Sequence, residues 1–432
     1  MENLRLYPRY RHITRREASA PRIVTGTPDD LARRVRDLAR EADDAVWLVA
    51  DANTAAAAPE IVDALPAARA TILPGTPTVV PEIELAEGFA RSVTESDSRI
   101  LVVIGGGSLT DLAKYAARVA DVGLISVPSA ASVDAYNSAR SALRIDGYHR
   151  TPDARVPDAV LASPQIIEAA PAELTLAGIG DLVAKIIARL DWELGALVTG
   201  EPFSLRETDW SARAARHALA RLRHGGLDAA AFPALDALLV TGRAMRVGGS
   251  SRSAASSEHT IAHLWEVAIA DEVESLHGLL VVRAAQYVVR AYEWILERLA
   301  SGTAASEPWP RQEEAGWQER VPADMQPFLG KMREESAGRV VNDVSVAERR
   351  GRIDQNRGAI VELARRTLSD AGRGLAALDA AGIASILPQV PDHWVGRGLQ
   401  WVKYLRNRYS MFDLAFEMGW EPELLAHMGV SE

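Results

Sequence analysis

Apolar and polar residues in the first third of the chain alternate in a pattern that predicts short buried strands separated by amphipathic helices. Runs of β-branched and other apolar residues predict strands over 45–54, 70–75, 99–107 and 123–129. Helical spacing of apolar residues predicts helices between them, over 59–68 and 84–93. Strands that alternate with helices indicate βαβ units, and therefore an α/β domain with a parallel sheet that binds ligands at the carboxyl ends of its strands.

The pattern changes near residue 165. From there the period is helical almost to the end of the chain, with few β-branched runs. We therefore predict an α/β domain over residues 1–165 and an all-helical domain over 166–432. The stretch 301–327 is rich in proline and acidic residues, and we interpret it as a surface excursion between helices.

Composition narrows the class of protein. The chain has 432 residues, 48% of them hydrophobic and 25% charged, which is typical of a globular protein with room for two domains. Its formal net charge of -10 argues against a nucleic-acid partner. No apolar run of about 18 residues and no signal-like start are present, so we expect a cytoplasmic protein without a membrane partner. Because there is no cysteine, a metal would need His, Asp, Glu or water ligands.

A glycine-rich turn follows the third predicted strand, in the sequence GGGSLTDLAK (105–114). Glycines let backbone N–H groups approach an anion, and Ser108 or Thr110 could cap the following helix, whose positive end favours phosphate. The turn matches neither the GxGxxG fingerprint nor the P-loop. A plain strand-to-helix turn is an equal alternative, with Asp111 and Lys114 as an ordinary surface pair.

Three of the nine histidines lie within a short window. His259 and His263 are four residues apart on one face of a predicted helix, so both imidazoles could bind the same cation. His277, from the next helix, could supply a third ligand. For His263 alone, a histidine satisfied by its own hydrogen bonds or a substrate contact is favoured over direct ligation. Asp181 with Lys185 could be a helix-start pair, or Asp181 could complete a His/His/Asp site for Zn, Ni or Fe.

Small hydroxyl residues follow the fourth predicted strand, in SVPSAASVDAY (126–136). They could line a cofactor or substrate pocket, with the carboxylate of Asp134 on the same loop. Ordinary loop composition is the alternative.

Together, and in this order, the motifs resemble the iron-dependent alcohol dehydrogenase and dehydroquinate synthase superfamily, and within it the sn-glycerol-1-phosphate dehydrogenase family of bacterial type. The resemblance spans nearly the whole chain. The matching stretches are VADANT (49–54), GGGSLTDLAK (105–114), SVPSAASVDAY (126–136), AGIGDLVAK with LDWEL (177–194), SSRSAASSEHTIAHLWE (250–266), LHG (276–278) and YLRNRYSMFDLAFEMGW (404–420).

The resemblance implies a dehydroquinate synthase-like fold, with a Rossmann-like first domain that binds NAD or NADP and a helical second domain that binds metal and substrate. The residues that it places near the cofactor are Asp51, Gly105, Gly106, Gly107, Ser108, Asp111, Ser129 and Ser132. It implies one divalent metal, Zn, Ni or Fe, held by Asp181, His259 and His277. It gives catalytic and substrate-binding roles to Asp134 and His263, and substrate binding to Lys185 and Arg252.

The activity expected from the resemblance is that of an NAD(P)-dependent dehydrogenase acting on a CH–OH group. Its substrate would be a phosphorylated polyol and the ketone derived from it, most like sn-glycerol-1-phosphate and dihydroxyacetone phosphate, in phospholipid metabolism and as a homodimer. One alternative is a dehydroquinate synthase-like cyclase that recycles NAD on a sugar phosphate, and another is a helical interaction protein. The chain departs from the family pattern at 251–256 and after His277, on the substrate side, so the exact substrate stays open.

Overall fold

This computed structural model describes residues 5–6, 21–65, 69–145, 148–270, 272–273, 275–307 and 309–430. The chain divides into two compact units. The first comprises Met1–Leu182 and Arg213–Ser250, and the second comprises Val183–Ala212 and Ser251–Glu432. Two long helices, α7 (Ala172–Thr199) and α8 (Leu205–Gly248), contribute residues to both units.

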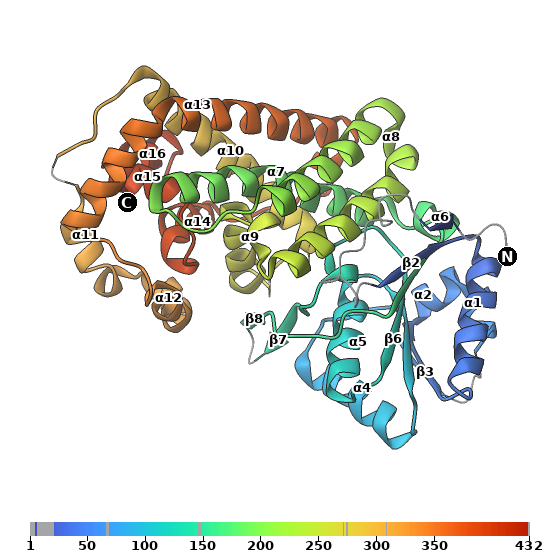
Figure 1. Ribbon diagram of the computed structural model, residues 1–432. Coiled ribbons are helices and arrows are strands. Elements are labelled where there is room, and N and C mark those ends of the chain that lie inside the picture. Colours follow the sequence, from blue (N-terminus) through green and yellow to red (C-terminus); the bar gives the residue numbers. More distant parts are fainter. Residues whose placement is uncertain are drawn as a thin grey trace. The chain divides into compact units, whose positions relative to one another are not determined.

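The first unit contains a seven-stranded sheet, whose strands follow the order β1-β2-β9-β6-β5-β3-β4 (Figure 1). Every neighbouring pair is parallel except β1 with β2. The strands are β1 (Arg5–Leu6), β2 (Arg22–Thr25), β3 (Val46–Asp51), β4 (Ala70–Leu73), β5 (Ile100–Gly105), β6 (Gly123–Pro128) and β9 (Ala159–Ala162). The predicted Rossmann-like parallel sheet is thus confirmed.

Alternate residues of the central strands pack into two separate cores, one on each face of the sheet. Val102 and Ile104 of β5 face a core that includes α1 (Pro28–Glu41) and α3 (Pro59–Asp63). Leu101 and Val103 face the opposite core with α4 (Ile83–Glu95) and α5 (Gly107–Val119). The two-residue period of a strand explains this division, and burial on both faces explains why these strands are continuous apolar runs.

The observed elements follow the predicted pattern, with shorter strands. The run 45–54 forms β3 only as far as Asp51, where the side chain of Asp51 accepts a hydrogen bond from Thr54 N and begins α2 (Ala52–Ala57). Part of the predicted helix 59–68 lies outside the described residues. The periodicity did not reveal strands β2 and β9, nor the hairpin of β7 (Leu143–Ile145) and β8 (Tyr148–Arg150).

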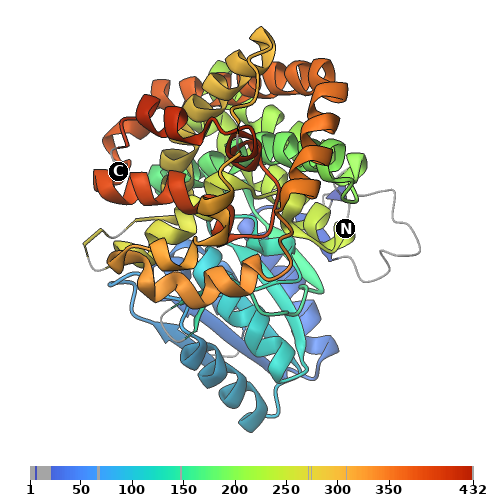
Figure 2. The same cartoon turned by 90° about the vertical axis from the view of Figure 1, so that its left-hand side faces the viewer.

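The second unit is helical, as predicted, and Figure 2 shows its yellow to red helices packed together. Helix α10 (His277–Ser301) packs against both α9 (Ser257–Ala268) and α13 (Asp343–Ala380). Its helices beyond α7 and α8 are α9 (Ser257–Ala268), α10 (His277–Ser301), α11 (Arg311–Ala315), α12 (Leu329–Ser336), α13 (Asp343–Ala380), α14 (Asp392–Leu405), α15 (Met411–Glu417) and α16 (Glu421–His427). No helix among the described residues has both the length and the apolar character needed to cross a membrane.

Most of the described residues in the stretch 301–327 are exposed or half-buried, as its composition predicts, but a few buried side chains anchor the stretch. Trp309 and Trp317 are buried, and Met325 is fully buried. The indole of Trp317 stacks on the ring of Tyr404 with centroids 4.6 Å apart. The polar and acidic residues around these three side chains dominate the composition of the stretch, so composition alone did not predict that the three are buried.

Candidate active site

The glycine turn joins the carboxyl end of β5 to the start of α5. Gly105 ends the strand, and Gly106 is the N-cap of the helix, with no side-chain cap. The proposal that Ser108 or Thr110 caps this helix is therefore wrong, because both lie inside its first turn. Backbone N–H groups at the start of a helix without a side-chain cap can donate hydrogen bonds to phosphate oxygens.

Close packing fixes the shape of this turn. A Cβ atom added at Gly107 would lie 2.5 Å from Cγ2 of Val133, so no larger residue fits there without movement. At Gly106 the nearest atom to such a Cβ is Oγ of Ser132, at 3.7 Å. The turn therefore lies against the loop after β6, and the backbone N of Ser129 donates to the carbonyl of Gly105 at 3.1 Å.

Lys114 and Asp111 form a buried pair, which corrects their interpretation as a surface pair. The Lys114 ammonium is fully buried and donates to Oδ1 of Asp111 at 3.1 Å, to the carbonyl of Ala135 at 2.9 Å and to Oγ of Ser138 at 2.8 Å. It also donates to the carbonyl of Arg140. Burial raises the pKa of Asp111, although the charge of Lys114 opposes the change. The pair fastens α5 to the loop that carries Asp134.

That loop is ordered by its own side chains. The hydroxyl of Tyr136, fully buried, donates to the carbonyl of Ala130 at 2.7 Å and lies 3.3 Å from Oγ of Ser132. Ser129 and Ser132 are both buried beside the glycine turn. Asp134 is the N-cap of a short 3₁₀ helix, Ala135–Asn137. The predicted nicotinamide-side residues thus share one rigid loop.

Helix α7 passes the same loop at close range within the first unit. A Cβ added at Gly178 would lie 1.7 Å from the carbonyl oxygen of Ala131, so only glycine allows this approach. Asp181 follows three residues later and is buried. Lys185, one turn further along α7, is fully buried in the part that belongs to the second unit.

The second unit brings the three histidines of the sequence motif together. His259 and His263 lie on α9, and His277 begins α10. The ring centroids are 6.0 Å apart for His259 and His263, 5.4 Å for His259 and His277, and 5.1 Å for His263 and His277. This His cluster (His259, His263 and His277) is a set of donors on two adjacent helices.

Glu266 organises the His cluster, and sequence reasoning missed it. Its Oε2 lies 2.7 Å from Nδ1 of His263, and its Oε1 lies 2.5 Å from Nδ1 of His277. Burial raises the pKa of Glu266, but the two imidazoles outweigh this effect and hold it well below its usual value. The signal was present in the sequence, since Glu266 is three residues after His263 and so on the same helical face.

The donors of this cluster suit a divalent transition metal. A carboxylate that engages Nδ1 of a histidine orients the ring and assigns metal binding to Nε2. Glu266 does this for two rings, and Oε1 of Glu258 lies 3.0 Å from Nδ1 of His259. Donor atoms of His263, Glu266 and His277 also lie within 4.8 Å of one another, a second arrangement in which the Glu266 carboxylate would itself be a ligand. A donor set of imidazole nitrogens and carboxylate oxygens suits divalent Zn, Ni or Fe.

Two other predicted residues have structural partners. Arg252 is buried, and its guanidinium Nε donates to Oε2 of Glu201 at 3.2 Å while Nη2 pairs with the other oxygen. Its charge is therefore balanced by one carboxylate. Asp51 uses Oδ1 to accept from Thr54 N at 2.7 Å.

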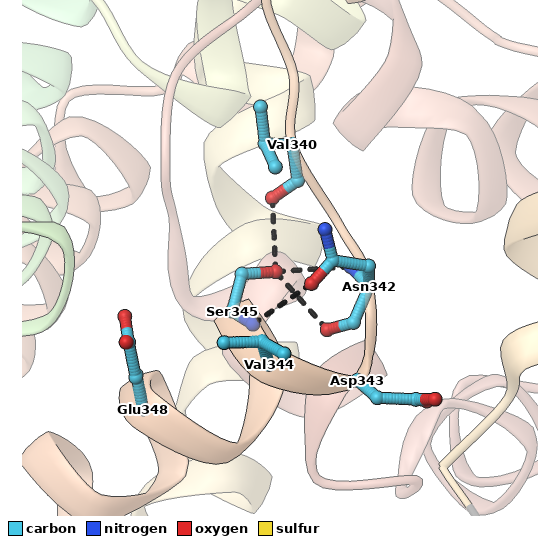
Figure 3. A pocket seen from close by; sticks show the side chains of 6 residues that line it. All are labelled: Val340, Asn342, Asp343, Val344, Ser345 and Glu348. Atoms are coloured by element: carbon cyan, nitrogen blue, oxygen red, sulfur yellow. Dashed lines mark hydrogen bonds between the residues drawn. The ribbon is translucent and has the colours of Figure 1, made fainter.

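A surface hollow at the start of α13 is separate from these residues. Figure 3 shows its lining, and the hydrogen bonds drawn there belong to a helix cap. Oδ1 of Asn342 accepts from Ser345 N at 3.0 Å, and Asn342 N donates to Oγ of Ser345 at 2.9 Å. These polar groups serve the helix end, so the hollow is no catalytic candidate.

Comparisons with solved structures show the fold. The iron-containing alcohol dehydrogenase from Thermococcus thioreducens is 16% identical, with a TM-score of 0.55 over 93% of this chain and 98% of that chain. A solved 1,3-propanediol oxidoreductase is 15% identical, with the same TM-score and coverage.

Curated relatives are similar over part of their length. Glycerol-1-phosphate dehydrogenase of Metallosphaera sedula is 33% identical over 204 residues, which cover 47% of this chain and 57% of the relative. The protein of that name in Bacillus velezensis is 30% identical over 248 residues, which cover 54% of this chain and 61% of the relative. The chain thus matches a little over half the length of these relatives.

The family model described as iron-containing alcohol dehydrogenase matches residues 23–171, which hold most of the sheet and the glycine turn. Residues 23–171 therefore carry the signature of the iron-containing alcohol dehydrogenase family, and the chain has the fold of that family.

Proposed function

We propose that this chain is a metal-dependent NAD(P)-linked dehydrogenase that interconverts a phosphorylated polyol and its ketone. The observation that carries the proposal is the His cluster around Glu266, in a chain whose residues 23–171 match the iron-containing alcohol dehydrogenase family. sn-Glycerol-1-phosphate and dihydroxyacetone phosphate are the proposed pair, since the curated relatives carry that substrate in their names.

Asp181, His259 and His277 are the proposed metal ligands. Two imidazoles and a carboxylate leave room for a substrate oxygen on a divalent ion. When bound, the ion supplies Lewis-acid polarisation of that oxygen. Glu266 and Glu258 fix the orientation of the imidazole rings through Nδ1.

NAD or NADP is the proposed cofactor, and it supplies the hydride chemistry when bound. Its diphosphate would lie on the backbone of the turn formed by Gly105, Gly106, Gly107 and Ser108, with Asp51 and Asp111 nearby. Support comes from the uncapped start of α5. Ser129 and Ser132 would face the nicotinamide, since their loop packs against the turn.

His263 and Asp134 are the proposed groups for substrate contact and proton transfer. His263 contacts Glu266, which can hold its imidazole in one tautomer. Lys185 and Arg252 are the proposed contacts of the substrate phosphate. In this scheme residues 1–165 bind the cofactor, and residues 166–432 bind metal and substrate.

The decisive experiment is a substrate panel with Zn, Ni or Fe reconstitution, monitored for both nicotinamide absorbance and phosphate release. Reduction of dihydroxyacetone phosphate with stoichiometric loss of NAD(P)H is the expected result. Phosphate release without net NADH would instead show the cyclase. His277→Ala should abolish turnover and keep the circular dichroism spectrum, and unchanged turnover would contradict the metal assignment.

We further propose a cytoplasmic homodimer that acts in phospholipid metabolism. Light scattering on the purified protein measures the oligomeric state directly, and a monomer at micromolar concentration would contradict the dimer. Retention of NAD or metal by the purified chain would argue against a purely structural interaction protein.

A further inference from the structure

Two arginines after α14 converge on one hydroxyl group in the second unit. Nη2 of Arg406 donates to Oγ of Ser251 at 3.2 Å, and Nη2 of Arg408 donates to the same oxygen at 2.7 Å. Nη1 of Arg408 also donates to the carbonyl of Ala255 at 2.6 Å. Both arginines are partly buried. We call Arg406 and Arg408 the arginine pair.

The arginine pair has no carboxylate in direct contact among the described residues, although the charges of Glu335 and Glu258 act on both guanidiniums from further away. In the described part of the chain, neither guanidinium forms an ion pair with a carboxylate. Glu335 accepts from the backbone N of Asn407 at 3.3 Å instead, and Oε1 of Glu258 accepts from Ser256 N at 2.9 Å. Neighbouring Arg252 already has Glu201. Two adjacent cations are thus held together with only neutral acceptors.

This arrangement costs free energy in the protein as it stands. Burial lowers the pKa of Arg408 well below its usual value, and the charges of Arg406 and Arg252 lower it further. Burial also lowers the pKa of Arg406. Partly buried like charges are stabilised when an anion binds between them. An anion bound between the two guanidiniums would therefore stabilise the arginine pair.

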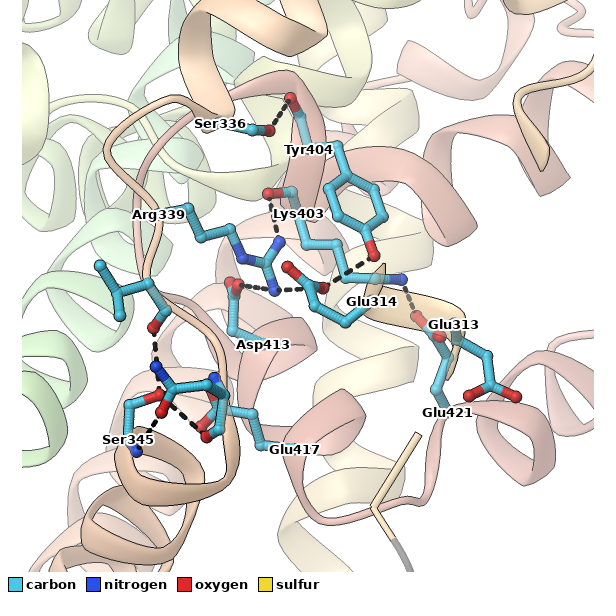
Figure 4. Close-up of polar contacts among 12 residues, drawn as sticks. Glu313, Glu314, Ser336, Arg339, Ser345, Lys403, Tyr404, Asp413, Glu417 and Glu421 are labelled. Carbon is cyan, nitrogen blue, oxygen red and sulfur yellow. Dashed lines mark hydrogen bonds and ion pairs between the residues drawn. The ribbon is translucent and has the colours of Figure 1, made fainter. Parts of the chain in front are cut away.

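The segment that carries the arginine pair is fixed on both sides, and Figure 4 shows the contacts that precede the pair. Before the pair, Nη1 of Arg339 donates to the carbonyl of Lys403 at 2.9 Å, and the hydroxyl of Tyr404 donates to Oε2 of Glu314 at 3.0 Å.

After the pair, the hydroxyl of Tyr409 donates to Oε2 of Glu417 at 3.0 Å, and Oγ of Ser410 donates to Oδ2 of Asp413 at 2.9 Å. The guanidinium positions are consequently set before any ligand arrives, which reduces the entropy cost of binding.

We propose that Arg406 and Arg408 add to the proposed contacts Lys185 and Arg252 and form a binding site for the phosphate group of the substrate. Guanidinium groups match the geometry of phosphate oxygens, and two of them balance the dianion of a phosphate monoester. The site lies at the start of the segment that leads into α9, since Ala255 is four residues before His259. The identity of the ligand as a polyol phosphate rests on the function proposed above, whereas the affinity for phosphate does not.

Thermal unfolding with inorganic phosphate tests the site without catalysis. Metal-free protein with NAD present, to fill the glycine turn, is compared in phosphate and in chloride at equal ionic strength. We expect phosphate to raise the Tm of the wild type, and Arg406→Gln and Arg408→Gln to lose most of that rise. Arg373→Gln removes a half-exposed arginine that pairs with Asp370 on α13, and it should keep the rise.

Equal stabilisation of the wild type and both variants, or none in the wild type, overturns the proposal. Should Arg408→Gln fail to fold, Arg408→Lys retains a charge without the guanidinium fork and is compared with Arg406→Gln in the same assay.

A kinetic assay connects the site to the substrate. The preference for glycerol-1-phosphate over glycerol, as a ratio of kcat/KM, should fall about 10- to 100-fold in Arg406→Gln and Arg408→Gln, because each removes charge-assisted hydrogen bonds. Arg373→Gln should keep the ratio. An unchanged ratio in both variants contradicts the assignment to the substrate phosphate. If the wild type turns over no polyol, the proposed function fails, and the thermal assay still decides the phosphate site.

Discussion

Nδ1 of His277 lies 2.5 Å from Oε1 of Glu266, and this contact leads to the first prediction. Glu266→Gln keeps the size of the side chain but removes the carboxylate that orients the imidazole. Metal affinity should fall about 10- to 100-fold, the usual effect of losing such an outer partner. Competition between the protein and a chelator of known affinity measures the change.

Glu293→Gln is the matched control for this prediction, since Glu293 is an exposed carboxylate on the same helix as His277. Its metal affinity should equal that of the wild type. Wild-type affinity in Glu266→Gln would show that the contact plays no part in metal binding.

The buried pair of Lys114 and Asp111 gives the second prediction. Lys114→Met removes the cation and leaves Asp111 with an uncompensated charge in a buried position. The free energy of unfolding in urea should fall by about 3–5 kcal/mol. The double variant Asp111→Asn with Lys114→Met should recover part of this loss, because no buried charge remains. A double variant that is less stable than Lys114→Met would contradict the explanation.

Periodicity predicted the sheet because each central strand is a short run of apolar residues that packs into a core on both faces. Val102 and Leu101 illustrate this, since they face opposite cores. Both positions are therefore apolar, and the strand has no alternation of polar and apolar residues. The burial of Lys114 could not be predicted, because its acceptors come from residues 21 to 26 positions later in the chain. Local spacing gives no information on such contacts.

Most of the predictable part of the candidate site consists of residues close in sequence, and His277, on the next helix, was predicted as a third ligand. His259 and His263 are neighbours through helical periodicity, and the glycine turn is contiguous. The arginine pair contacts Ser251 across 155 and 157 positions, and nothing in the local pattern around Arg406 points to that hydroxyl. Glu266 was missed for a different reason, since its spacing from His263 was visible but its contact with His277 requires the packing of two helices.

A pair of glycines gives the third prediction. Gly178→Ala places a Cβ 1.7 Å from the carbonyl oxygen of Ala131, so α7 or the loop must move. We expect a loss of at least about 1–3 kcal/mol in the free energy of unfolding. Gly358→Ala on α13 meets no atom within 4 Å and should gain about 0.5–1 kcal/mol, because alanine favours the helix. Urea unfolding of both variants measures the contrast, and equal effects would refute the close approach.

Asp191 gives the fourth prediction, which concerns pH. The carboxyl is fully buried on α7, where Oδ2 accepts from Tyr292 at 2.7 Å and Oδ1 accepts from Met411 N at 3.2 Å. Burial raises its pKa from 3.8 to about 6, although hydrogen bonds from Ser256 and Tyr292 oppose the change.

Between these two pKa values the native state holds a proton that the unfolded chain has released. The contribution of Asp191 to stability is therefore present at low pH and is lost as the pH rises toward 6. The shift corresponds to roughly 3 kcal/mol.

Asp191→Asn cannot titrate and should lose this dependence. In urea unfolding of the metal-free protein, the stability of Asp191→Asn relative to the wild type should rise by roughly 2 kcal/mol from pH 4 to pH 7, since part of the full change lies below pH 4. Asp228→Asn, which changes an exposed aspartate of α8, should follow the wild-type profile. A constant difference between Asp191→Asn and the wild type across this range would mean that Asp191 ionises at the same pH in the native and unfolded states, and that its hydrogen bonds compensate fully for its burial.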